Sequence, residues 1–197
     1  MKILGLTGSI AMGKSTTSMM LKTMAIPVYD ADKCVHDLFQ KGGDATMKIK
    51  ELFPTAIIGG AVNRHLLGSL VFGKPDKLEA LESIVHPLVK AKRQAFLSLH
   101  RRRGTKRVVL DIPLLFETHS ERDCDYILVV SAPWFLQRQR ALLRPGMDIK
   151  KLKAILQRQI PDYKKRQMAT VVIPTGLGKS NTFRKLRRWI VNASKTR

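Results

Sequence analysis

The residues whose types and spacing best suit chemistry lie in one loop close to the N-terminus. Residues 8–15 read GSIAMGKS, so Gly8, Gly13, Lys14 and Ser15 follow the pattern G-x-x-x-x-G-K-[ST]. Glycines at this spacing let the backbone curl until successive N–H groups face an anion, while the lysine and the hydroxyl reach nucleotide phosphates and Mg²⁺. The pattern predicts a phosphate-binding loop. The plainer alternative is a glycine-rich turn between a strand and a helix.

A second stretch of similar sequence serves as a comparison for this loop. Residues 175–180 read TGLGKS and also end in GKS, but Ile173 stands where a phosphate loop has its first glycine, five positions before Gly178. We expect this shorter loop to be an ordinary connection between a strand and a helix. Its Gly176 would border a nucleotide pocket without enclosing the triphosphate.

Acidic residues follow two of the predicted strands. Asp30 and Asp32 come directly after the second strand, and Asp111 follows the apolar run RVVL. Because the carboxyl ends of parallel strands meet at one edge of a sheet, these carboxylates are expected beside the phosphate loop. One of the first pair could accept the proton of an attacking hydroxyl, and the alternative is an aspartate that caps a turn or a helix. Asp111 resembles the acid that holds Mg²⁺ in nucleotide-binding sites.

Two arginines in the basic C-terminal third could serve phosphoryl transfer. Arg140 and Arg144 are four residues apart, which predicts that they share one face of a helix. Cations that close over the transferring group stabilise its charge, and a closing segment also excludes water. The alternative is a solvated basic face. The chain lacks an N-K-x-D guanine signature, so a kinase is favoured over a GTPase.

The elements that must position these residues alternate along the chain. Apolar runs predict strands over 2–6, 26–29, 107–110, 126–130 and 170–173. Helices are predicted over 15–24, 33–39, most of 64–100, 132–143, 149–160 and 182–193. Ser131 and Asp148 are expected to cap the helices that follow them, and Pro87 to break or kink its helix. The alternation predicts a parallel α/β sheet covered on both faces.

Composition limits the remaining possibilities. The 197 residues are 44% apolar, enough for one core with a small appended region. No apolar run approaches the roughly 18 residues of a membrane span, and Cys34 and Cys124 lack a metal-like spacing, so we expect a cytoplasmic protein with reduced thiols and no membrane partner. The net charge is +21, and residues 131–197 hold 17 bases against 2 acids. Such a positive charge would attract a nucleotide or a nucleic acid. The plainer alternative is a solvated basic surface with no specific partner.

Five motifs together resemble the dephospho-coenzyme A kinase family: GLTGSIAMGKST, DAD, LESIVHP, VVLDIPLLFE and QRQRALLRPGM. The resemblance implies a P-loop NTPase fold in one α/β domain, with a five-stranded parallel sheet like that of nucleoside monophosphate kinases. The core would comprise residues 1–31, 105–133 and 167–197, with a helical CoA-binding region over about 32–104 and a lid over about 134–166. The activity would be ATP- and Mg²⁺-dependent phosphorylation of the ribose 3′-hydroxyl of dephospho-CoA, the last step of CoA synthesis.

The resemblance also implies roles for individual residues. The ATP phosphates would be cradled by Ala11, Met12, Gly13, Lys14, Ser15 and Thr16. Asp32 would be the base that orients the 3′-hydroxyl, and Arg140 the lid cation, assisted by Arg144. The acceptor side would be shaped or contacted by Arg64, His86, Pro87, Asp111, Leu114, Leu115 and Phe116. Ser15 and Asp111 would bind Mg²⁺.

Some positions depart from the family's usual pattern. The family often reads Asp-Arg where this chain has Asn63-Arg64, Ala-Asp where it has Ala169-Thr170, and Asn or Asp in place of Pro174. Pro174 lacks both a side-chain amide and a backbone N–H, so base contacts there must come from carbonyls or neighbours. Alternatives to the main expectation are a kinase of another acceptor, such as a nucleoside monophosphate, and a basic nucleic-acid-binding ATPase. We expect dephospho-CoA as the partner, no specific nucleic acid and a monomer.

Overall fold

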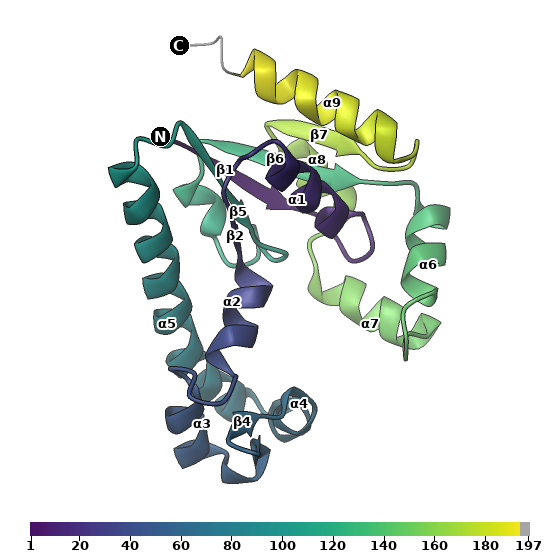
Figure 1. The fold of residues 1–197 in the computed structure, drawn as a ribbon. Coiled ribbons are helices and arrows are strands. Elements are labelled where there is room, and N and C mark those ends of the chain that lie inside the picture. Colours follow the sequence, from purple (N-terminus) through teal and green to yellow (C-terminus); the bar gives the residue numbers. More distant parts are fainter. Residues whose placement is uncertain (194–197) are drawn as a thin grey trace. The chain divides into compact units, whose positions relative to one another are not determined.

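The computed structural model describes residues 1–193. Contacts within the chain divide it into two compact units. The first joins Met1–Val28 to the chain from Thr105 onward, and the second is Tyr29–Gly104. Figure 1 labels the elements of both.

A parallel sheet forms the centre of the first unit. The unit contributes the strands β1 (Lys2–Thr7), β5 (Arg107–Asp111), β6 (Tyr126–Ser131) and β7 (Val171–Pro174). The fifth strand, β2 (Val28–Asp30), begins at the last residue of Met1–Val28 and continues into the second unit, and the strand order is β2-β5-β1-β6-β7 (Figure 1). The pairs β1–β5, β1–β6 and β6–β7 are parallel. The strand β1, which leads into the phosphate loop, lies in the middle with a neighbour on each side. The five-stranded sheet predicted from the sequence is confirmed.

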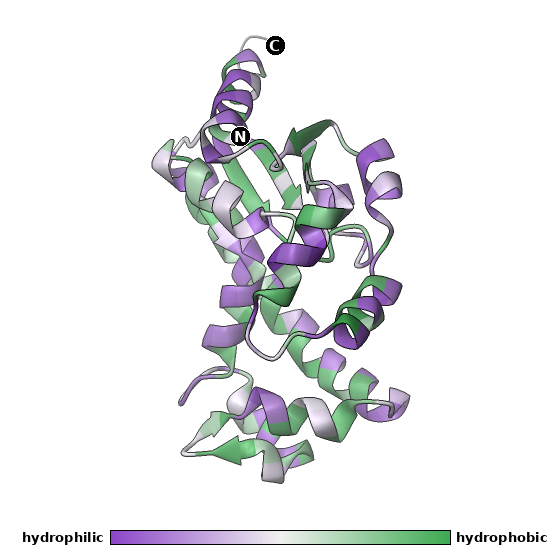
Figure 2. Ribbon diagram, turned by 90° about the vertical axis from the view of Figure 1, so that its right-hand side faces the viewer, coloured by the Kyte–Doolittle hydropathy of each residue, from purple (hydrophilic) through white to green (hydrophobic). Residues whose placement is uncertain are grey.

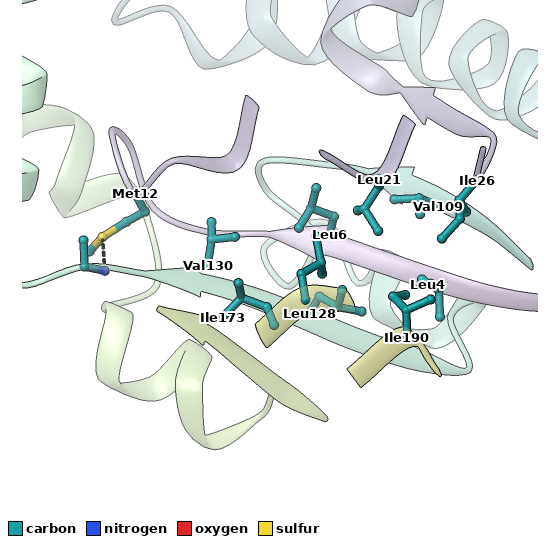
Figure 3. Packing of buried hydrophobic residues seen from close by; sticks show 12 residues of the cluster. Leu4, Leu6, Met12, Leu21, Ile26, Val109, Leu128, Val130, Ile173 and Ile190 are labelled. Atoms are coloured by element: carbon teal, nitrogen blue, oxygen red, sulfur yellow. Dashed lines mark hydrogen bonds between the residues drawn. The ribbon is translucent and has the colours of Figure 1, made fainter. Parts of the chain in front are cut away.

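Helices α1 (Lys14–Thr23) and α9 (Lys179–Asn192) pack on one face of this sheet. Their apolar side chains join the buried cluster drawn in Figure 3, which includes Leu6, Leu21, Leu128 and Ile190. Figure 2 shows the strands largely hydrophobic, whereas the helices alternate between hydrophilic and hydrophobic residues, as expected of helices with one buried face. This packing fixes α1, whose N-terminus begins at the phosphate loop.

The first unit also holds η2 (Ser120–Asp123), α6 (Trp134–Leu142), α7 (Ile149–Arg158) and α8 (Asp162–Gln167). Fully buried Lys165 of α8 places its Nζ 2.8 Å from Glu117 Oε1, and the same oxygen accepts the Ile160 N–H. Asp162 Oδ2 accepts a hydrogen bond from the Ser131 hydroxyl at 2.7 Å. These contacts fix the chain after α7 to the end of β6 and to Glu117 in the segment that follows β5.

The predicted helix cap at Ser131 is wrong, whereas the cap at Asp148 is confirmed. Ser131 ends β6, and α6 begins only at Trp134, with Pro133 as its N-cap. The residue before a proline avoids the helical region, so Ala132 cannot begin the helix and Ser131 is too far away to cap it. Asp148 accepts a hydrogen bond from the Lys151 N–H at 2.7 Å at the start of α7.

The second unit is mainly helical. Its elements are α2 (Ala31–Leu38), α3 (Thr46–Leu52), η1 (Pro54–Ala56), β3 (Ile57–Ile58), β4 (Ala61–Val62), α4 (Arg64–Val71) and α5 (Pro75–Arg102). They surround a core of their own, with Leu38, Ile49, Phe53 and Leu67 among its buried residues. The Tyr29 hydroxyl donates to the Val89 carbonyl of α5 at 3.1 Å, and burial raises the pKa of this phenol, so it stays protonated as a donor. This bond holds the chain just before α2.

The expected break at Pro87 is absent, because α5 runs through that residue from Pro75 to Arg102. A proline inside a helix removes the hydrogen bond to the carbonyl four residues earlier, here that of Ser83. Both Pro87 and Ser83 lie on the exposed side of α5, so water can hydrate the carbonyl that loses its partner.

A small antiparallel hairpin, β3–β4, was not predicted. Its turn is Gly59-Gly60, with φ angles of 59° and 80° that glycine adopts without strain. Two glycines between short apolar runs are a known hairpin signal, and Ile57-Ile58 and Ala61-Val62 supply those runs.

Candidate nucleotide-binding site

Residues 8–13 connect β1 to α1 in a tight curve. Ala11 and Gly13 both have left-handed backbones, with φ of 61° and 92°, and Gly13 is the N-cap of α1. Alternation of ordinary and left-handed residues turns successive N–H groups toward one side, and the first N–H groups of a helix have no partner within the helix. The exposed Ser15 and Thr16 lie in that first turn. The loop therefore has the geometry of an anion-binding site at a helix N-terminus.

Gly8 is needed because the loop passes directly over β6. A Cβ added to Gly8 would lie 2.4 Å from Val130 Cγ2 and 2.8 Å from the Val130 carbonyl oxygen. Neither atom can yield easily, because both belong to a central strand of the sheet. We expect Gly8→Ala to lower the free energy of unfolding by about 1–3 kcal/mol, the usual cost of overpacking, as measured by urea denaturation.

Gly68 of α4 provides the matched control. A Cβ there would meet nothing within 4 Å, and the residue is inside a helix. Gly68→Ala should leave stability unchanged or raise it by about 0.5–1 kcal/mol. An unchanged urea midpoint in Gly8→Ala would contradict the close approach of the loop to β6.

Lys14 and Asp111 form an ion pair beneath the loop. Lys14 Nζ lies 2.7 Å from Asp111 Oδ1, and Asp111 is only 1% exposed. Asp111 ends β5, where its Cα pairs in register with Leu6 of β1. The two predicted site residues are thus brought together by adjacent parallel strands, as expected from the edge of the sheet. In this structure the Asp111 carboxylate is thus the partner of Lys14, the residue that the sequence predicts to contact a nucleotide phosphate.

Asp111 also provides the chemistry that Mg²⁺ needs. Among residues 1–193, no group of three or more His, Cys, Asp or Glu side chains is placed to hold a metal ion. Mg²⁺ at nucleotide sites is bound through one or two protein oxygens, with water and phosphate completing its shell. A single buried carboxylate, paired with Lys14 next to the exposed Ser15 in the sequence, fits that type of site.

Arg140 of α6 is held against the loop that follows β7. Its Nη1 donates to Thr175 Oγ1 at 3.1 Å and its Nη2 to the Thr175 carbonyl at 2.7 Å. Gly176 packs against the start of α6, because a Cβ there would lie 2.9 Å from Pro133 Cδ. This loop, the second stretch that ends in GKS, is short, because β7 ends at Pro174 and α9 begins at Lys179.

The prediction that Arg140 and Arg144 share a helix face is wrong. Helix α6 ends at Leu142, and Arg144 lies exposed in the turn that follows. Pro145 comes next, and the residue before a proline disfavours the helical conformation. Arg140 alone is therefore positioned by α6.

Two glutamines that sequence reasoning missed hold the peptide groups of Ile10. Gln159 Oε1 accepts the Ile10 N–H at 3.0 Å, and Gln137 Nε2 donates to the Ile10 carbonyl at 2.9 Å. Ala11 packs beside them in a buried cluster with Ala141 and Leu152. Met12 adds a further contact, since its sulfur accepts the Ala132 N–H at 3.1 Å (Figure 3). The two glutamines are separated from Ile10 by 127 and 149 positions in the sequence. No local sequence pattern links residues so far apart, so only the fold reveals these contacts.

Five of the candidate residues belong to the second unit: Asp30, Asp32, Arg64, His86 and Pro87. Asp30 is the N-cap of α2 and accepts the Lys33 N–H at 3.0 Å, so the capping alternative holds for this residue. Asp32 lies in the first turn of the same helix with an exposed side chain. Arg64 is exposed at the start of α4, and His86 and Pro87 are exposed in the middle of α5.

The three apolar candidates after β5 differ in exposure. Leu114 is exposed, whereas Leu115 and Phe116 are buried. Leu115 lies against β1, because a Cβ added to Gly5 would be 3.0 Å from its Cδ2. Of the three, Leu114 alone has an exposed side chain, whereas the other two are part of the core.

The parallel sheet with a phosphate loop between β1 and α1, and an acid at the end of β5, defines a P-loop kinase fold. A family model described as dephospho-CoA kinase matches residues 2–179, and the chain belongs to this family. A relative from Paramagnetospirillum magneticum named dephospho-CoA kinase is 56% identical over 166 residues, 84% of this chain and 78% of its own.

Solved structures agree with this fold. TT1252 from Thermus thermophilus aligns with a TM-score of 0.83 and 34% identity, covering 100% of this chain and 98% of its own. The dephospho-CoA kinase of Campylobacter jejuni aligns with a TM-score of 0.74 at 23% identity, over 99% and 98% of the two chains. Within the part of the chain that the structure describes, no helix has both the length and the apolar character needed to cross a membrane.

Proposed function

We infer that the chain catalyses the ATP-dependent phosphorylation of dephospho-CoA, a step of coenzyme A biosynthesis. The observation that carries this inference is the phosphate loop, with its Lys14–Asp111 pair, in a chain that the family model matches over residues 2–179. A kinase of another acceptor and a nucleic-acid-binding ATPase are not favoured.

The reacting hydroxyl is proposed to be the ribose 3′-hydroxyl, with Asp32 as its base. The oxygen of that hydroxyl attacks the γ-phosphorus of ATP, its proton passes to the Asp32 carboxylate, and ADP leaves with the electrons of the broken P–O bond. The exposed carboxylate of Asp32 supports this role, because it is open to a ligand. Lys14 and Arg140 would bind the phosphate charge as it develops.

Mg²⁺ would be held by Asp111 and Ser15 together with the nucleotide. When bound, it neutralises negative charge on the β- and γ-phosphates. The chain's own contribution is to hold the buried Asp111 carboxylate in a fixed place at the end of β5, where Lys14 pairs with it.

The remaining assignments extend the proposal to binding. Residues 32–104 would hold the acceptor, with the exposed side chains of Arg64, His86, Pro87 and Leu114 available for contact and Asp111 near the transferred group. Residues 134–166 would form the lid, and the backbone at Gly176 would flank the adenine of ATP. Arg144, exposed after α6, would assist Arg140. A cytoplasmic location and a working monomer complete the proposal.

The test is ADP release by the purified chain with ATP and Mg²⁺, with and without dephospho-CoA. We expect release only when dephospho-CoA is present, and a product heavier by one phosphoryl group. Release that ignores dephospho-CoA would count against the acceptor. Release stimulated by DNA or RNA, with a steep dependence on salt, would support the nucleic-acid alternative instead.

A further inference from the structure

One buried side chain, that of Thr175, contacts both the phosphate loop and Arg140. Its hydroxyl donates to the Met12 carbonyl at 2.7 Å and accepts from Arg140 Nη1 at 3.1 Å. A threonine hydroxyl has one proton and two lone pairs, so it can serve a carbonyl and a guanidinium at the same time. Its backbone carbonyl adds the second bond to Arg140, at 2.7 Å to Nη2.

Thr175 is itself fixed by the sheet. Its N–H donates to the Ser131 carbonyl at 2.8 Å, just beyond the last paired residues of β6 and β7, and the residue is 7% exposed. It also lies against Gly13, since a Cβ added to that glycine would be 3.1 Å from Thr175 Oγ1. The same side chain therefore borders the residue before Lys14 and the arginine of α6.

We propose that Thr175 is a positioning residue that holds Arg140 in a fixed place relative to the phosphate loop, so that one triphosphate meets Lys14 and Arg140 together. The proposal rests on the proposed kinase function. Arginine has many rotamers, and ordering its side chain in advance reduces the cost of binding. The acceptors that Thr175 offers are neutral oxygens, so this contact places no anion against the guanidinium in competition with a phosphate.

Thr175→Val tests the role of the hydroxyl, because valine keeps the shape and removes the hydrogen bonds. We expect kcat/KM for ATP to fall about 10-fold or more, as for loss of hydrogen bonds to a charged group, while KM for dephospho-CoA stays the same. Thr175→Ser, which keeps the hydroxyl, should restore most of the loss. If the valine variant does not fold, Thr175→Ala provides the same comparison with serine.

A double-mutant cycle with Arg140→Ala separates positioning from stability. If Thr175 acts through Arg140, Thr175→Val should add little to the loss already caused by Arg140→Ala. Thr182→Val is the matched control, because the buried Thr182 hydroxyl donates to the carbonyls of Pro174, which ends β7, and Gly178, the N-cap of α9. It should change the melting temperature without changing kcat/KM for ATP.

Two results would overturn the proposal: unchanged kcat/KM for ATP in Thr175→Val, or losses that add fully in the double mutant. Binding of ATP, measured by calorimetry without any acceptor, gives a second readout of the same variants. That readout stays informative even if dephospho-CoA proves not to be the acceptor. Failure of the positioning role and failure of the proposed function are therefore distinguishable.

Discussion

Asp32→Asn should abolish phosphoryl transfer while ATP still binds. Asparagine keeps the shape of the side chain but cannot accept the proton of the attacking hydroxyl, and loss of a general base typically lowers kcat by about 10²–10⁴-fold. The substitution leaves the phosphate loop untouched. ADP release with dephospho-CoA measures kcat, and calorimetric titration measures the affinity for ATP.

Asp30→Asn is a control with the same change in charge, two residues away. Asp30 caps α2 by accepting the Lys33 N–H, and asparagine caps helices about as well as aspartate. This variant should keep both its stability and most of its kcat. A normal turnover number in Asp32→Asn would rule out Asp32 as the base.

Lys14→Ala should remove ATP binding and transfer together. The ammonium is the one side-chain cation of the phosphate loop motif, and loss of a single group that stabilises developing charge costs about 10²–10³-fold in rate. Removal of the lysine also takes away the partner 2.7 Å from buried Asp111, so some loss of stability should accompany it. Calorimetry with ATP measures binding, the rate of ADP release measures transfer, and urea denaturation measures the loss of stability.

Lys179→Ala provides the matched control within the same chain. Lys179 belongs to the second GKS, but it is exposed at the start of α9 and no complete loop precedes it. Its removal should leave the affinity for ATP nearly unchanged. Equal losses in the two variants would mean that charge alone, rather than the phosphate loop, determines nucleotide binding.

The strands and the phosphate loop were predictable because their signals are local. A short apolar run bounded by glycine or acid forms a strand wherever the chain can bury it, and each predicted strand lies within two residues of its place. Asp111 could be placed below the loop because parallel strands present their carboxyl ends at one edge of the sheet.

The errors arose where a proline or a distant partner decides the local structure. Ser131 has a cap-forming side chain, yet Pro133 delays the helix and the hydroxyl bonds to Asp162 instead. Pro87 was expected to break or kink its helix, but α5 continues through it, since Pro87 lies on the exposed side of a helix held by packing on its other side.

The support of the site could not be predicted, because it depends on contacts between distant residues. Thr175 bonds to Met12 across 163 positions, and Gln159 bonds to Ile10 across 149. A threonine in a loop or a glutamine after a helix carries no signal that names its partner. Such contacts appear only once the sheet order brings the segments together.

The two glutamines on Ile10 have a mechanical consequence for the segment between them. Residues 138–158 start and finish at side chains attached to the same P-loop residue, one through its N–H and one through its carbonyl. A swing of the whole segment as one body must break both bonds, whereas bending inside the α6–α7 hairpin keeps them. The segment is thus tethered to Ile10 at both ends, and any rotation of these ends pulls directly on the backbone of the loop that precedes α1.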